Sequence, residues 1–265
     1  MNTKKYVIVF DLDETIGYFS DIYIFWNLLN NYINHYNIDY KYLYNLFDLF
    51  PEIFRTDIFK LFKILKIKKE NNLCDNVMLF TNNNGPTYWV TLIKNYIHEK
   101  INYKLFDQII RAFKVNGNII EPDRTTNNKK YSDLLNCTKL PKNTEICFID
   151  DSYFKEMIHD NVLYIQLRPY YYYIDFKLIT NTFYNNNINL FKTSYNHFED
   201  YILSNINNIN NRKIINRNKY IVKYNEEVLI TNKLITEINN FFIYKGTKHK
   251  KTKKNKKYKI KTIKL

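Results

Sequence analysis

The chain has 265 residues, of which 45% are hydrophobic, so it can bury a substantial core without disulfide or metal staples. Its net charge of +14 is uneven, because residues 245–265 carry eleven lysines and no acid, which leaves about +3 elsewhere. The three cysteines match no metal or disulfide spacing, and neither a leader-like start nor a membrane-length apolar stretch occurs. We therefore expect an intracellular, soluble protein, nuclear or cytoplasmic, that does not engage a membrane.

The first informative stretch is an uninterrupted apolar run, residues 6–10, followed by Asp11 and Asp13. Such a run is typical of a strand covered on both faces in a parallel α/β sheet. Ligands of parallel sheets collect at the carboxyl ends of the strands, so Asp11 is expected where chemistry takes place. An extended exit would point both carboxylates to one side, where they need a cation, a shared proton or strong donors, and Mg²⁺ meets that need. A turn or a helix cap is the alternative for a single Asp in this position.

A helical pattern over about residues 18–73 separates this strand from the next. Ser20 is a plausible N-cap for the first of its helices, and Pro51 suits the first turn of another. A second apolar run, residues 77–80, then ends in Thr81 and Asn82, ahead of a further helix. A Thr hydroxyl together with backbone amides at a helix start can hold phosphate oxygens, although a Thr here is more often an ordinary cap.

The remaining apolar runs complete an α/β pattern. Residues 105–110 predict a third strand, residues 146–149 a fourth and residues 162–165 a fifth, and about 185–243 read as helical. The fourth run ends in Asp150 and Asp151. Adjacent acids repel each other when buried, and with Asp11 nearby a magnesium ion among them is the economical explanation.

The five residues Asp-Leu-Asp-Glu-Thr at 11–15 resemble the first motif of the haloacid-dehalogenase-like (HAD) phosphatases. This wording is common in the branch that acts on carboxyl-terminal-domain phosphoserine. Thr81 and the Asp150–Asp151 pair are similar to the second and fourth motifs, in the same order. The third motif requires a lysine, and Lys130 is chosen over Lys129 and Lys114 because it opens a helix that leads to the next strand.

The resemblance implies a Rossmann-like parallel sheet with helices on both faces, a helical insertion after the first strand and a helical C-terminal extension. The expected divisions are a HAD-like core at 1–17 and 74–180, an insertion at 18–73, an extension at 181–244 and a basic, disordered tail at 245–265. In the family an insertion at this place caps the active site. The alternative is that these helices simply pack on the sheet.

The resemblance also implies the chemistry of a phosphoric monoester hydrolase with Mg²⁺ as cofactor. Asp11 would form an aspartyl-phosphate, and Asp13 would be the general acid and base. Thr81, Asn82 and Lys130 would bind the substrate phosphate. The expected metal ligands are Asp11, Asp13 through its main-chain carbonyl, Asp150 and Asp151, with Asp151 ranked ahead of Asp150 for direct contact.

The substrate and partners are predicted less narrowly than the reaction. A phosphoserine or phosphothreonine protein is the first expectation, and a nucleic-acid phosphate end or a small metabolite is the alternative with the same chemistry. A non-catalytic binding module is the third possibility. The tail from Lys245 to Lys264 could contact nucleic acid, act as a nuclear address or serve as a solubilising end.

Overall fold

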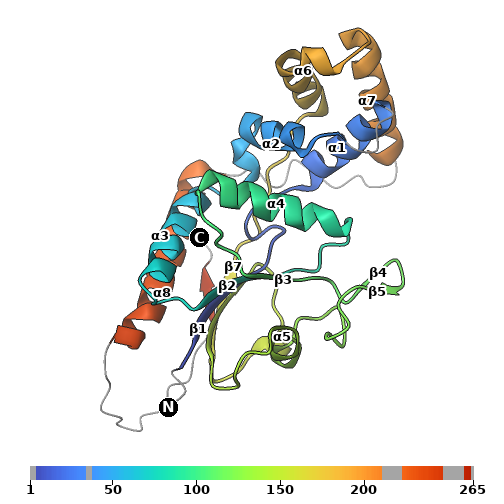
Figure 1. Cartoon of the computed structure of the whole chain (residues 1–265). Coiled ribbons are helices and arrows are strands. Elements are labelled where there is room, and N and C mark those ends of the chain that lie inside the picture. The colour runs from blue at the N-terminus through green and yellow to red at the C-terminus, as the bar shows by residue number, and fades with distance from the viewer. Residues whose placement is uncertain (1–3, 34–37, 211–222, 247–259, 264–265) are drawn as a thin grey trace. The chain divides into compact units, whose positions relative to one another are not determined.

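The computed structural model describes residues 4–33, 38–210, 223–246 and 260–263. The chain forms two compact units, which we treat separately. Unit 1 comprises Met1–Ile16, Arg55–Tyr170 and Lys223–Leu265, and unit 2 comprises Gly17–Phe54 and Tyr171–Val222. Figure 1 shows both and labels many of their elements.

Unit 1 contains a parallel sheet of six strands in the order β3-β2-β1-β6-β7-β8, which confirms the predicted α/β, Rossmann-like class. The strands are β1 (Tyr6–Phe10), β2 (Asn76–Phe80), β3 (Gln108–Ile110), β6 (Glu145–Asp150), β7 (Val162–Leu167) and β8 (Lys261–Ile263). The chain builds the sheet outward from β1 in one direction and then, from β6, in the other. The strand order therefore reverses between β1 and β6, the place where open α/β sheets bind their ligands.

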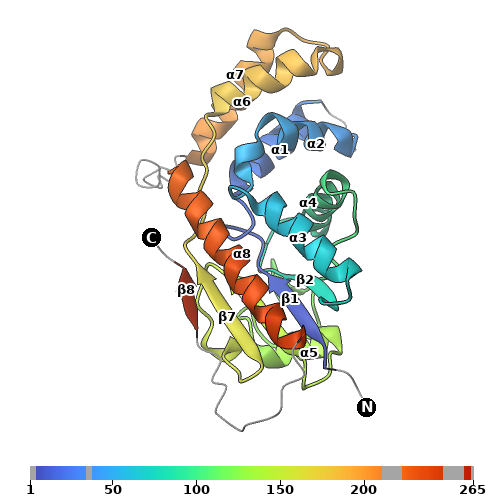
Figure 2. The ribbon, with the colours of Figure 1, turned by 90° about the vertical axis from the view of Figure 1, so that its left-hand side faces the viewer.

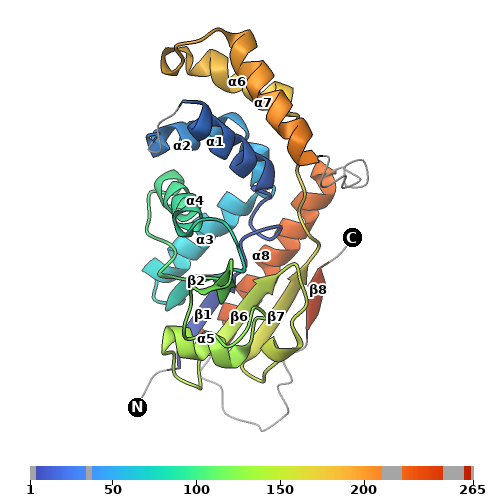
Figure 3. The same cartoon turned by 90° about the vertical axis from the view of Figure 1, so that its right-hand side faces the viewer.

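Helices cover both faces of this sheet. Its helices are α3 (Ile58–Glu70), α4 (Thr87–Lys100), α5 (Tyr131–Thr138) and α8 (Tyr224–Gly246). Figures 2 and 3 view opposite sides of the molecule, with α8 in front of the sheet in one and α5 in front in the other. On the α5 face, Val9 and Phe148 share a buried cluster with Leu134. On the other face, the ring of Phe10 meets that of Phe62 of α3 edge to face, with centroids 6.0 Å apart. Burial on both faces explains why the strand sequences are apolar without alternation.

The predicted strands at 6–10, 77–80, 146–149 and 162–165 are confirmed, whereas the third is shorter than expected and begins at Gln108. The observed helix starts differ more from the predicted ones. Phe19, and not Ser20, precedes the first helix as its N-cap residue. Pro51 opens only a short 3₁₀ turn, Pro51–Ile53, and α3 begins at Ile58. The structure also contains a small antiparallel hairpin, β4 (Lys114–Val115) and β5 (Asn118–Ile119), that the sequence did not indicate.

The two units divide the chain at other places than the predicted boundaries. Of the expected insertion at 18–73, α1 (Ser20–Tyr32) and α2 (Tyr40–Leu49) belong to unit 2, but α3 belongs to unit 1. Of the expected extension at 181–244, α7 (Tyr195–Asn210) lies in unit 2 and α8 in unit 1. The reason is packing, since α8 contacts α3, β7 and β8, whereas α7 contacts α1 and α6 (Phe176–Asn186). Each helix therefore belongs to the unit against which it packs, whatever its place along the chain.

The tail at 245–265 was expected to be disordered throughout, and for its end this is wrong. Residues 261–263 form β8, which pairs in parallel with β7, and Ile263 is buried. The Arg168 amide donates to the carbonyl oxygen of Ile263 at 3.2 Å, and the Lys261 ammonium pairs with Glu237 of α8. Backbone hydrogen bonds to β7 and the burial of Ile263 thus stabilise this strand, although the surrounding sequence is rich in lysine. Lys245 lies in α8, and the residues of the predicted nucleic-acid arm at 247–259 and 264 fall outside the described ones.

Unit 2 is helical and its core is largely aromatic. The ring of Phe25 of α1 meets Phe183 of α6 and Phe198 of α7, with centroids 5.5 and 6.2 Å away. Gly17 pairs with Phe54 in an isolated antiparallel bridge. A Cβ atom at Gly17 would lie 2.4 Å from the carbonyl oxygen of Ile53, so only glycine fits this close backbone approach. Across the described portions of both units, every helix is too short or too polar to cross a bilayer.

One half-buried histidine in unit 1 makes folding sensitive to pH. The backbone N–H of Phe106 donates to His98 Nε2 at 2.9 Å, so the ring must be neutral. Burial, with the nearby Lys94 and Lys69 ammonium groups, lowers the pKa of His98 from 6.5 to about 4. A base with a lowered native pKa contributes stability above its unfolded pKa and loses that contribution as pH falls toward the native value.

We therefore expect wild-type protein to lose stability relative to His98→Gln as pH falls from about 6.5 to 4. Gln keeps an acceptor for Phe106 but does not titrate. After a discount for partial solvent exposure, the relative loss should be about 1 kcal/mol. Urea unfolding of both proteins at pH 7.5 and pH 4.5 measures it. If the free energy of unfolding changed equally in the two proteins between these pH values, the proposed effect of His98 would be contradicted.

Candidate active site

The register of the sheet places two carboxylates side by side. Phe10 pairs with Ile149, so the next residues, Asp11 and Asp150, stand at the same level where β1 and β6 end. Because side chains alternate along a strand, these carboxylates point to the α5 face, as Val9 does two residues earlier. Asp11 is 6% exposed and Asp150 is 1% exposed. Two like charges this close and this buried require a positive partner.

Lys129 supplies that partner. Its ammonium group contacts Asp11 and donates to Asp150 Oδ2 at 2.7 Å, and the residue is 1% exposed. Burial lowers the pKa of Lys129, but the two carboxylates raise it more, so the net shift is upward and the group stays charged. The nitrogen also lies 5.6 Å from the ring centroid of Phe80 and 5.5 Å from that of Phe154, within the range of cation–π attraction.

The structure thus places Lys129, and not the predicted Lys130, against Asp11 and Asp150. Lys130 is the N-cap residue of α5 with extended backbone angles, φ −130° and ψ 145°. Neighbouring side chains on extended backbone point in opposite directions, so an inward Lys129 turns Lys130 outward. Its ammonium donates to Thr125 Oγ1 at 3.2 Å near the surface. The third candidate, Lys114, lies in the β4–β5 hairpin with an exposed side chain.

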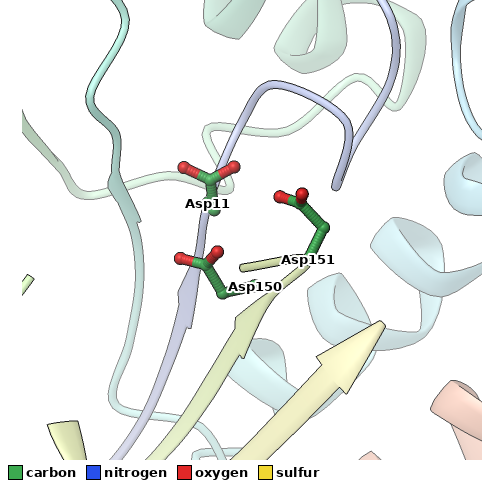
Figure 4. A group of neighbouring side chains, drawn as sticks. All are labelled: Asp11, Asp150 and Asp151. Atoms are coloured by element: carbon green, nitrogen blue, oxygen red, sulfur yellow. The ribbon is translucent and has the colours of Figure 1, made fainter. Parts of the chain in front are cut away.

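Asp151 completes an acidic group with Asp11 and Asp150. One carboxylate oxygen from each of the three lies within 4.8 Å of the others. Figure 4 shows them gathered at the carboxyl ends of β1 and β6, with Asp151 turned toward the other two. Thr15 holds Asp151 twice, since its hydroxyl donates to Oδ1 at 3.2 Å and accepts from the Asp151 amide at 3.0 Å. Both oxygens of Asp150 have donors in Lys129 and the Ser152 amide, at 2.7 and 2.9 Å, whereas those of Asp151 have only longer bonds, from the Thr15 and Ser152 hydroxyls at 3.2 and 3.5 Å.

Burial makes the acids at this edge of the sheet electrostatically costly. It raises the pKa of Asp13 to about 7, helped by the charge of Asp11 and opposed by a hydrogen bond from Asn83. Burial likewise raises the pKa of Glu14 to about 8, with the charge of Asp13 as the next cause. The pKa values of Asp150 and Asp151 are also raised by burial, although Lys129 opposes both shifts.

The turn after β2 brings a second set of polar groups to the same edge. Thr81 is buried, and its hydroxyl oxygen accepts from the Asn83 amide at 3.0 Å, which leaves the hydroxyl proton free to be donated. Asn83 Nδ2 donates to Asp13 Oδ2 at 2.9 Å and so joins this turn to the first acidic segment. Asn82, the predicted phosphate ligand, directs its side-chain oxygen to Arg124 at 2.8 Å instead. The contact with Asp13 therefore comes from the residue after the predicted one.

Arg124 is a residue of this site that the sequence did not indicate. It is 2% exposed and donates to the carbonyl oxygen of Thr81 at 3.2 Å and to that of Arg111 at 2.6 Å. It thereby holds the ends of β2 and β3 together. No local signal marks it, because the oxygens of Thr81, Asn82 and Arg111 that it binds lie 13 to 43 residues away along the chain. Arg111, just beyond β3, donates to Thr91 Oγ1 on α4 at 3.1 Å.

The acidic group fits a divalent cation by charge and by ligand type. If all are ionised, the three carboxylates outnumber the single Lys129 ammonium by two charges. Carboxylate oxygens are hard ligands of the kind that Mg²⁺ selects. The Asp13 side chain is not one of the three whose oxygens come together, and Asn83 binds it instead. Asp11, Asp150 and Asp151 are therefore the side chains that could hold a metal.

The fold and this edge together define a Rossmann-like α/β protein with an acidic site at the point where its strand order reverses. The sequence of the chain matches no protein-family model and no curated protein.

Removing the buried ammonium tests the geometry of the lysine. Lys129→Met leaves Asp11 and Asp150 buried without a counter-charge, and we expect the free energy of unfolding at pH 7.5 to fall by about 3 kcal/mol. Lys130→Met is the matched control, expected to change stability by less than about 0.5 kcal/mol because its group lies near solvent. Denaturant titrations in EDTA would compare them. An equal effect of the two substitutions would show that Lys129 does not neutralise the pair.

Proposed function

We propose that this protein is a Mg²⁺-dependent phosphatase of the HAD type, which hydrolyses a phosphomonoester through an aspartyl-phosphate. The observation that carries this proposal is the meeting of a buried lysine with Asp11 and Asp150, beside Asp151 and the Asn83–Asp13 contact. These side chains come from four separate segments and converge on one edge of the sheet. Phosphoryl transfer needs a positioned nucleophile and positive charge near the phosphate oxygens, and both are available there.

Asp11 is the proposed nucleophile. Lys129 binds its Oδ1, and within the described residues no donor reaches its other carboxylate oxygen. That oxygen would attack phosphorus, forming a new O–P bond as the bond from phosphorus to the substrate's leaving oxygen breaks. Lys129 would keep the attacking carboxylate oriented, and with the Thr81 hydroxyl it would balance charge on the transferring group.

Asp13 is the proposed general acid and base. It lies two residues from the nucleophile, is oriented by Asn83, and has a pKa of about 7, so it is suited to giving and taking a proton near neutrality. It would protonate the leaving oxygen in the first step. In the second step it would take a proton from water, whose oxygen attacks phosphorus, breaks the bond to Asp11 and releases inorganic phosphate.

A magnesium ion held by Asp11, Asp150 and Asp151 would supply neutralisation of the phosphate oxygens. The proposed participation of the Asp13 main-chain carbonyl follows the resemblance alone. The substrate class also follows from that resemblance: a phosphoserine or phosphothreonine protein first, with a nucleic-acid phosphate end or a small metabolite as alternatives. We assign Thr81 and Lys129 to the phosphate, in place of the pair Asn82 and Lys130.

The activity itself is tested with an aryl phosphate and Mg²⁺. Wild-type protein should release phosphate, and Asp11→Asn should lower kcat more than about a thousandfold because the nucleophile is lost. Lys130→Met should retain wild-type kcat, since its side chain points away from the site. If Asp11→Asn protein turned over as fast as wild type, the aspartyl-phosphate route would be excluded.

The metal ligands are tested by titration calorimetry with MgCl₂. Asp151→Asn should weaken Mg²⁺ binding at least about tenfold, because it removes a charged ligand whose own hydrogen bonds are long, at 3.2 and 3.5 Å. Asp123→Asn is the control, since Asp123 is exposed and pairs with Lys139. Unaltered Mg²⁺ affinity in the Asp151 variant would remove Asp151 from the ligand set.

The substrate class is tested by a screen over phosphopeptides, nucleotides and end-phosphorylated oligonucleotides. A kcat/KM at least about tenfold higher for phosphopeptides, a difference of about 1.4 kcal/mol in transition-state binding, would support the first class. Preference for oligonucleotide ends would favour the alternative.

A further inference from the structure

Arg55 is a buried side chain that makes four hydrogen bonds. It stands where the chain re-enters unit 1, and its guanidinium group is wholly inaccessible to solvent. Nε donates to the carbonyl oxygen of Thr15 at 2.7 Å, and Nη2 donates to those of Glu14 and Arg168, each at 2.8 Å. Nη1 donates to Glu227 Oε2 at 2.7 Å. One side chain thus binds the segment after Asp13, the end of β7 and the start of α8.

The segment that Arg55 binds is strained. Glu14 has a φ of +56°, in the left-handed region that residues with a Cβ atom adopt at a cost. Its carbonyl oxygen accepts from both Arg55 Nη2 and the Tyr170 amide, the latter at 2.8 Å. Strained backbone persists when the surroundings over-determine it, and these two donors do so here. The conformation at Glu14 sets the path of the chain between Asp13 and Thr15.

The same segment also orients Asp151. Arg55 Nε fixes the carbonyl of Thr15, while the Thr15 hydroxyl bonds to the Asp151 amide and carboxylate. Arg55 thus restrains two consecutive carbonyls without touching Asp13 or Asp151 itself. The first, that of Glu14, belongs to the residue next to the proposed acid–base residue, Asp13. The second, that of Thr15, belongs to the residue whose hydroxyl holds the proposed metal ligand, Asp151.

The charge of Arg55 is balanced by Glu227, which lies in the first turn of α8. Glu227 is 2% exposed, and its Oε1 accepts from Arg168 Nη2 at 2.7 Å. Negative charge in a first helical turn is also favoured by the helix dipole. The α8 segment, more than 200 residues from β1 in sequence, thus supplies the counter-ion for the support of the first acidic segment.

We propose that Arg55, held by Glu227, is a positioning residue that fixes the Glu14–Thr15 backbone so that Asp13 and Asp151 face the reacting phosphate. The role in the reaction rests on the proposed function, whereas the hold on the backbone does not. A lysine cannot replace Arg55, because one ammonium group lacks the planar set of donors that meets three carbonyls and a carboxylate at once.

The test combines kinetics with amide hydrogen exchange on the full chain. In Arg55→Lys we expect kcat for an aryl phosphate to fall about 10–100-fold while KM changes less than about threefold, because alignment and not binding is lost. Exchange of the peptide that covers residues 12–17 should accelerate at least about tenfold. Glu227→Gln keeps an oxygen for Arg55 and should show the same changes to a smaller extent, even if the lysine variant folds poorly.

Lys69→Met is the matched control, because it breaks a partly buried ion pair of the same unit, with Asp107 at 2.6 Å, away from the acidic segment. It should lower thermal stability but leave kcat and the exchange of residues 12–17 unchanged. The proposal would be overturned if residues 12–17 exchanged at the wild-type rate in both Arg55→Lys and Glu227→Gln. It would also be overturned if kcat fell no further in these variants than in Lys69→Met. If wild-type protein lacks phosphatase activity, the proposed function fails, and exchange alone still decides the positioning role.

Discussion

The contact of the Lys129 ammonium with Asp11 and Asp150 is the interaction on which the rest of this site depends. Pairing of β1 with β6 forces the two carboxylates to the same level and the same face, whatever their function. Their repulsion in a poorly solvated place would oppose that pairing if no positive charge lay between them. Lys129 therefore serves both folding and the proposed chemistry. Its ammonium group neutralises the two buried carboxylates and also orients the proposed nucleophile, Asp11.

The site is nevertheless a cost to the folded state. Burial raises the pKa values of Asp13 and Glu14 to about 7 and 8, so whatever stability these groups contribute is lost as pH rises through those values. Glu14 adds backbone strain through its positive φ. The apolar sheet, covered by helices on both faces, offsets these terms by burying side chains such as Phe10 and Phe148 completely. Cation binding at the carboxylates would relieve part of the cost.

Two buried arginines support the turns that carry the site. Arg55 binds the carbonyls that follow β1, and Arg124 binds the carbonyls at the ends of β2 and β3. Backbone oxygens at a strand end have left the hydrogen-bond ladder, and when buried they require other donors. A guanidinium group provides several donors in one plane, which suits it to two or three carbonyls at once. The precision of the site therefore comes from side chains that need not touch a substrate.

The sequence by itself determined the strands and the acids at their ends, because a strand buried on both faces has a local apolar signature and Asp11 and Asp150 directly follow or end such runs. It determined the class of fold for the same reason. Only the tertiary structure decided between Lys129 and Lys130, since the choice depends on which of two alternating side chains faces the sheet. It alone showed Arg55 as a support and β8 as a strand, because their partners lie far away along the chain and leave no local pattern.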